Sequence, residues 1–186
     1  MSAQTENNRT LPAAGTWVID PSHSTIGAIA RHLVVSKVRG HFGKFEGTIT
    51  VADEPTESQV ALTIESASIT TGSEDRDNHL RSPDFLDVEN HPQLSFVSTS
   101  VTPKGEGWSL AGELTLRGQT HPVDIDFEFL GAHADPWGNL KAVFTGSTRL
   151  EREKWGVNWN APLEAGGLLV SKHLDIELEI QATFQA

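Results

Sequence analysis

Histidine is the residue type in this sequence that can take the widest range of chemical roles, because a neutral imidazole ligates metals and titrates near physiological pH. No two of the eight histidines stand four residues apart, and the pattern His-Glu-x-x-His is absent. The spacing therefore predicts no metal site, although strand pairing could still bring two of them together. The histidines are His23, His32, His41, His79, His91, His121, His133 and His173.

Nucleophilic catalysis has little support in the sequence. Ser24 follows His23, but a catalytic triad is defined by geometry and not by neighbouring positions. There is no Gly-x-Ser-x-Gly elbow, phosphate-binding loop or dinucleotide fingerprint. The absence of cysteine excludes disulfides, thiolate ligands and thiol nucleophiles. We expect a protein that is not an enzyme and requires no cofactor; the alternative is a metal-dependent or other enzyme that uses the interior as its active site.

The charge balance restricts the partners. Asp and Glu number 25 against 14 Lys and Arg, which gives a net charge of −11. Surfaces that bind phosphates need clustered Lys and Arg, and the sequence has no basic run. This argues against nucleic acid and anionic membranes as partners, and only a local basic patch would escape the count.

The chain also lacks signals for the membrane or for export. No apolar run approaches the roughly 20 residues of a membrane-spanning helix, so we expect a soluble protein without a transmembrane segment. The first ten residues lack the apolar core of a signal peptide. We therefore expect a cytoplasmic location, a flexible N-terminal arm over residues 1–13, and a single domain over residues 14–186.

Alternation of apolar and polar residues dominates the chain. Near the C-terminus, for example, Leu174, Ile176 and Leu178 alternate with Asp175 and Glu177. One apolar and one acidic face is typical of a half-buried antiparallel strand. Turns rich in Gly and Pro separate eight such segments and favour hairpins in up-and-down order. The predicted strands cover 14–20 joined to 23–34, 44–53, 57–67, 93–102, 106–117, 121–131, 139–152 and 172–184.

Eight amphipathic strands must hide their apolar faces, and closing the sheet into a barrel does so without exposed edges. The predicted fold is all-β: an extended eight-stranded antiparallel up-and-down barrel with one short helix. Thr71 and Glu74 fit a capping box for this helix, and Pro83 ends it. A seven- to nine-stranded sandwich also fits the periodicity. The barrel could be filled by side chains or hold one small ligand, and a homodimer would have to use side-chain surfaces.

Five stretches of the sequence resemble the YceI-like family, whose members are lipocalin-like polyisoprenoid-binding proteins. They follow one another in order between about residues 16 and 184. They are WVIDPSHSTI at 17–26, RHLVVSKVRGHFG at 31–43, RDNHLRSPDF at 76–85, GELTLRGQT at 112–120 and GVNWNAPLE at 156–164.

The resemblance implies a lipocalin-like barrel that binds a long isoprenoid, either a polyprenyl lipid or a quinone, in its lumen without catalysing a reaction. The sequence departs from the family at Ala28 and Ala30, where members often carry Phe and Val. The smaller side chains could widen the lumen. Many members are exported, whereas no export signal is visible here.

The candidate ligand-binding residues are the apolar side chains expected to face inward, together with one histidine and two loop tryptophans. His32 could hydrogen-bond a quinone carbonyl or a prenyl phosphate, or its ring could be satisfied by a neighbouring hydroxyl or backbone group. Trp155 and Trp159 lie in an irregular stretch over 153–171 and could plug the barrel mouth or fold over a ligand. The full set is Ile26, Ala28, Ala30, His32, Phe45, Ile49, Leu62, Ile64, Phe96, Trp108, Leu114, Phe127, Phe144, Trp155, Trp159 and Leu178.

One charged cluster, formed by Arg76, Asp77, Arg81 and Asp84, stands beside the predicted helix. We interpret it as a solvated salt-bridge network that closes one barrel end, and not as an active site.

Overall fold

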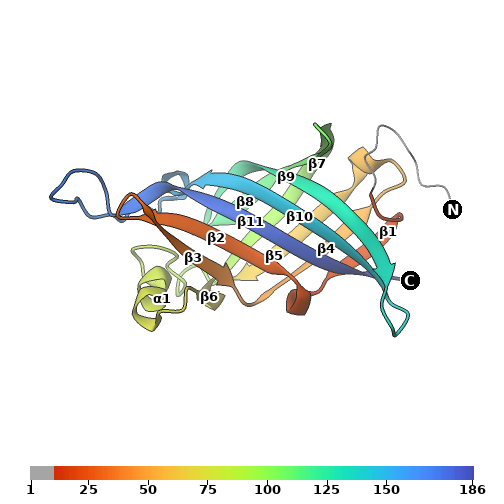
Figure 1. Ribbon diagram of the computed structural model, residues 1–186, viewed down its shortest axis with the longest axis horizontal. Helices are drawn as coiled ribbons and strands as arrows, with labels where there is room; N and C mark the ends of the chain where they lie inside the picture. Colours follow the sequence, from red (N-terminus) through yellow and green to blue (C-terminus); the bar gives the residue numbers. More distant parts are fainter. Residues whose placement is uncertain (1–10) are drawn as a thin grey trace.

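The computed structural model describes residues 11–186, and its strands form one antiparallel sheet (Figure 1). The predicted arm falls mostly on residues 1–10, which lie outside the described residues, and Leu11 packs against the core. The strands are β1 (Gly15–Ile19), β2 (Thr25–His32), β3 (Ser36–Phe42), β4 (Phe45–Val51), β5 (Gln59–Glu65), β6 (Ile69–Thr70), β7 (Gln93–Lys104), β8 (Gly107–Leu116), β9 (Gln119–Ala134), β10 (Leu140–Glu151) and β11 (Val170–Gln185).

The sheet closes on itself. Its ring runs β1-β4-β5-β7-β8-β9-β10-β11 and returns to β1, with Trp17 opposite Phe184 at the closing pair. Neighbours in the ring follow the chain in up-and-down order, as short hairpin turns at 105–106, 117–118 and 135–139 require. The predicted eight-stranded antiparallel barrel is confirmed, and the sandwich alternative is wrong.

The first strand is bent, as predicted, at Pro21. A short 3-10 turn, η1 (Pro21–His23), separates β1 from β2, and the Asp20 carboxylate accepts a hydrogen bond from the Ser22 backbone N–H at 3.0 Å. Strand β11 is long enough to pair with both parts, so that Ile26 on β2 lies opposite Leu178. This bend carries β2 away from the closed ring while keeping its inward face continuous with that of β11.

Strand β3 was missed by the sequence prediction, which left residues 35–43 outside any strand. Val38, Gly40 and Phe42 alternate with charged residues, but the alternation is short and interrupted by glycine. Within the described part of the chain, β3 pairs with β2 on one side and with β6 only at His41 and Phe42 on the other. The first residues of β3 therefore form a sheet edge, and the expectation that the barrel has no free edge is wrong.

The predicted short helix is present as α1 (Glu74–Arg81), but its predicted capping box is wrong. Ser73 occupies the N-cap position. The Thr71 hydroxyl instead donates to Asp77 Oδ1 at 2.6 Å, and the Thr71 backbone N–H donates to the same oxygen at 2.8 Å. The helix is thus fixed by a carboxylate reaching back to β6 and the loop after it.

The predicted salt-bridge network beside this helix is also wrong. Arg81 donates to the backbone carbonyls of Ala67 and Ile69, both at 2.9 Å. Asp84 pairs with the His79 ring at 2.8 Å. Backbone carbonyls compete successfully for the guanidinium because the helix packs directly on the η3–β6 segment (η3, Ser66–Ser68).

Over residues 11–186, no helix is long and apolar enough to cross a membrane.

Candidate ligand-binding cavity

An apolar cavity of about 190 Å³ lies inside the barrel. Its wall is built by inward side chains of the ring strands and of β2 and β3, with Leu11 and Ser58 among the remaining lining residues. Pockets that hold drug-sized ligands usually measure roughly 300–1,000 Å³. The cavity as it stands therefore accommodates only a slender apolar segment.

The wall exposes no polar atom to the cavity. Three lining residues carry hydroxyls, but each hydroxyl is engaged with backbone. Thr148 donates to Asp124 O at 2.7 Å and Thr145 donates to Leu178 O at 3.4 Å, while Ser58 Oγ accepts the Ala52 N–H at 3.1 Å. A polar ligand group would lose its hydrogen bonds to water on entering this space, which is strongly unfavourable. The cavity therefore suits hydrocarbon alone.

The structure brings nine of the sixteen predicted residues together around this cavity. They come from β2, β4, β5, β7, β8, β9, β10 and β11, so nearly every ring strand contributes. The nine are Ile26, Ile49, Leu62, Ile64, Phe96, Leu114, Phe127, Phe144 and Leu178.

The other seven predicted residues do not line it. Phe45 and Trp108 are buried in the packed core beside the cavity, and Trp108 stacks on Phe127 with ring centroids 6.5 Å apart. Ala28 lies opposite Ile176, a lining residue, and so keeps the predicted inward direction, but the cavity stops short of it. The remaining four are Ala30, His32, Trp155 and Trp159.

His32 lies at the last position of β2, opposite Ser36 and Val170. It is half-buried and outside the cavity wall. Its predicted hydrogen bond to a quinone or a prenyl phosphate stays a prediction. Among the described residues, no three His, Asp or Glu side chains gather as a group that could hold a metal ion.

Most lining residues that sequence reasoning missed occupy the same alternating faces. Val123 and Ile125 precede Phe127 at intervals of two, and Ile176 and Ile180 flank Leu178 in the same way. Alternation could have identified these four residues. Leu11 carried no such signal, because it precedes the first strand.

Trp155 closes one end of the barrel interior. It belongs to η4 (Arg152–Trp155), is 2% exposed, and donates from Nε1 to Leu114 O at 3.0 Å. The His121 ring meets it edge-on at 5.2 Å between centroids. In this structure Trp155 is buried and fills this end of the interior.

Arg152, at the start of η4, stabilises the same end of the barrel. Its Nε donates to Ser171 O at 2.8 Å, and Nη1 donates to Val157 O and Trp159 O at 2.8 and 2.9 Å. Burial lowers the pKa of this guanidinium, partly offset by Glu153. A single buried cation thus holds the start of the long loop against β11.

Trp159 links this loop to the helix. Its ring contacts His79 edge-on at 4.7 Å and Phe85 at 5.4 Å between centroids. Arg117 Nη1 donates to the carbonyls of Phe85 and Gly156, both at 3.2 Å. Together α1, η4 and the β8–β9 turn form one closure, which we call the plug.

Comparison with known proteins identifies relatives of this chain. A family model described as the YceI-like domain matches residues 17–182. A UPF0312 protein of Vibrio cholerae is 36% identical over 174 residues, which are 90% of this chain and 87% of that protein. A UPF0312 protein of Staphylococcus epidermidis is 36% identical over 160 residues, 85% of this chain and 91% of its own.

Solved structures share the fold at lower identity. The crystal structure of Burkholderia cenocepacia BcnA superposes with a TM-score of 0.76 at 20% identity, covering 88% of this chain and 98% of that one. A polyisoprenoid binding domain from Saccharophagus degradans, implicated in plant cell wall breakdown, gives a TM-score of 0.70 at 12% identity, with coverage of 91% and 98%. These likenesses concern the fold.

Proposed function

The chain belongs to the YceI-like domain family, and we propose that it binds one long apolar isoprenoid, a polyprenyl lipid or a quinone tail, inside its barrel without catalysing a reaction. The observation that carries this proposal is the cavity with no polar atom on its wall. A hydrocarbon tail leaves water there at a gain of roughly 25 cal/mol per Å² of buried apolar surface. The name of the Saccharophagus degradans neighbour adds support for an isoprenoid.

The cavity must widen to take a full chain. Its walls carry many half-buried Leu, Ile and Val side chains, among them Leu62, Leu114 and Ile176, and we expect rotamer changes of these side chains to enlarge the space without moving the strands. The polar head of the lipid has no partner inside and is expected to stay outside the cavity wall. Length and unsaturation of the tail then decide affinity more than the chemistry of the head.

The same wall supports the proposed non-catalytic role. Acid–base chemistry needs a titratable side chain within hydrogen-bond reach of the reacting group, and the lining consists of apolar residues, one glycine and the three engaged hydroxyls. We propose that no cofactor is required, so that a bound isoprenoid or quinone is ligand and not catalyst.

Solvent extraction of the purified protein, followed by mass spectrometry of the extract, tests this function. We expect a co-purifying lipid that contains isoprene units, and native mass spectrometry should show one lipid per chain. Protein stripped of lipid should rebind an added polyprenyl quinone. An empty protein that also rejects polyprenyl quinones and polyprenols would overturn the proposal, and stoichiometric turnover of the lipid would favour the enzyme alternative.

A further inference from the structure

The turn between β2 and β3 presents three consecutive apolar side chains to solvent. Leu33, Val34 and Val35 are 48%, 59% and 75% exposed. The loop after η4 supports this turn, because the Leu33 N–H donates to Leu169 O at 3.0 Å. Leu168, 41% exposed, adds a fourth apolar side chain in that loop. We call Leu33, Val34 and Val35 the β2–β3 tip.

The backbone of this tip is unfavourable for its residues. Leu33 and Val34 have φ values of 51° and 68°, in the left-handed region. Tight hairpins with two such residues prefer Asn-Gly, and a β-branched residue with positive φ is a genuine outlier. Folding alone would be better served by a polar or glycine-containing turn, so the apolar side chains are retained against local preference.

The charges directly behind the tip are also unfavourable for folding. Arg31 and Lys37 lie opposite each other on β2 and β3, where like charges destabilise a strand pair. Neither is among the salt-bridged residues of the described chain. Their positive field lowers the pKa of Asp175, after the larger effect of its hydrogen bond from Arg149. In a chain of net charge −11, two cations beside an apolar tip that take part in no salt bridge of the described residues form a local exception.

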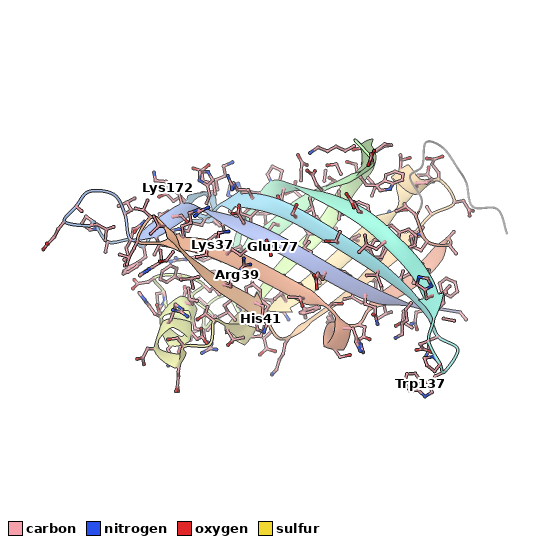
Figure 2. All side chains as sticks on the ribbon, viewed as in Figure 1. Lys37, Arg39, His41, Trp137, Lys172 and Glu177 are labelled. Carbon is pink, nitrogen blue, oxygen red and sulfur yellow. The ribbon has the colours of Figure 1, made fainter. Side chains whose placement is uncertain are left out.

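The opposite end of the molecule offers a comparison. Trp137, in the β9–β10 turn, is 84% exposed, and Figure 2 shows it far from Lys37, Arg39 and Lys172. The Asp135 carboxylate organises its turn by accepting the N–H groups of Trp137 and Asn139. Lys141, on the strand that follows, contacts Asp20 at 3.7 Å. The lysine near this exposed apolar residue is thus paired with a carboxylate, unlike the cations behind the β2–β3 tip.

We propose that the β2–β3 tip docks onto an anionic phospholipid bilayer, with its apolar side chains in the interface and with Arg31 and Lys37 against the lipid phosphates. Stable membrane binding needs two such signals, apolar insertion and basic charge, because either alone gives only weak binding. The strained turn and the like-charge pair are then explained together. Docking brings the plugged end of the barrel to the membrane and does not depend on which lipid occupies the cavity.

Vesicle co-sedimentation with the full chain tests this. The probes are vesicles of phosphatidylcholine alone and of phosphatidylcholine with phosphatidylglycerol. Wild type should prefer the anionic vesicles, and raised salt should release it. Each Lys or Arg near an anionic surface contributes roughly a fivefold change in binding, so Arg31→Gln with Lys37→Gln should weaken it by about 30-fold. Val34→Ser with Val35→Ser should weaken binding even at low salt.

Trp137→Ser is the matched control, since it removes a larger exposed apolar side chain from a turn at the other end. It should leave vesicle binding unchanged. Equal binding of wild type to neutral and anionic vesicles, wild-type binding by both the Arg31/Lys37 variant and the Val34/Val35 variant, or loss of binding in Trp137→Ser would each overturn the proposal. Lipid extracted from these two variants should match that from wild type, which separates failure of docking from failure of the proposed lipid binding.

Discussion

Two regions of the molecule, the apolar cavity and the plug, are built from different parts of the chain: strands line the cavity, whereas a helix, a 3-10 turn and a hairpin turn form the plug. In the cavity, aliphatic side chains from facing strands leave space between them. In the plug, Trp155 and Arg152 fill the space and tie it to backbone carbonyls of three different segments. The strands alone thus enclose an incomplete core, and the connecting segments of the plug complete it at their end of the barrel.

The difference assigns separate roles to the two regions. Hydrogen bonds to buried carbonyls hold the plug in one conformation, because breaking any of them leaves a buried polar group unsatisfied. The cavity wall exposes no such groups to the interior, and the cavity should therefore tolerate a change of contents. Stability should therefore be concentrated in the plug and ligand capacity in the cavity.

Truncating the plug should have the largest effect on stability. Trp155→Ala removes a side chain that is 2% exposed together with its hydrogen bond to Leu114. Replacing a buried Trp by Ala costs about 3–5 kcal/mol, so we expect the free energy of unfolding, measured in urea, to fall by about that amount.

Trp137→Ala is the control for this change, because that tryptophan is 84% exposed. Surface substitutions usually change stability by less than about 0.5 kcal/mol. Equal losses in the two variants would show that Trp155 does not hold the barrel closed.

Acid should weaken the helix side of the plug. Burial raises the pKa of Asp77, but hydrogen bonds from the Thr71 side chain and backbone and from Thr70 outweigh it, and the net pKa lies below the ordinary 3.8. A carboxylate with a lowered folded-state pKa stabilises the protein above the unfolded value, and this contribution is lost as pH falls through the folded value. Hydrogen bonds to a charged group contribute about 1.5–3 kcal/mol.

The variant for this test is Asp77→Asn. At neutral pH it should unfold at lower urea concentration than wild type, and the difference should shrink as the pH falls below the ordinary pKa of a carboxyl toward the lowered pKa of folded Asp77. Far-ultraviolet circular dichroism during urea titrations at neutral and acidic pH measures this. A difference that is constant with pH would contradict the ionised carboxylate as the source of the stability.

The sequence predicted the barrel well because burial of a half-exposed strand leaves a period of two in the chain, as along β11. It failed at β3, where the apolar side of the strand is Val38, Gly40 and Phe42 and the glycine suggested a turn. It also failed at Thr71, because a capping box and a hydroxyl bound to Asp77 require the same residue types. Local patterns cannot distinguish two partners for one hydroxyl.

The cavity was predicted less completely than the barrel. Alternation places a side chain inside but does not say whether its neighbours across the barrel reach it. Ala28 and Phe127 both face inward, yet the cavity extends only to Phe127. For Trp155 the sequence left two roles open, plugging the barrel mouth or folding over a ligand, because its partner, Leu114 O, is distant in sequence and belongs to the backbone.

Filling the cavity should have the smallest effect on stability and the clearest effect on ligand. Leu62 lines the cavity, whereas Val97, on the neighbouring strand β7, is 55% exposed on the outside. Overpacking a filled core costs about 1–3 kcal/mol, but Leu62→Trp extends into existing space. We therefore expect the free energy of unfolding of lipid-free Leu62→Trp to lie within about 1 kcal/mol of the wild-type value. Before it is stripped, the purified variant should contain much less lipid than wild type. Val97→Trp, which adds the same ring outside the barrel, should retain the wild-type amount. Thermal unfolding of stripped protein and lipid content per chain, measured on the same samples, give both quantities. If Leu62→Trp is strongly destabilised without lipid, the interior was already packed at that point; if its lipid content is unchanged, the isoprenoid does not occupy this cavity.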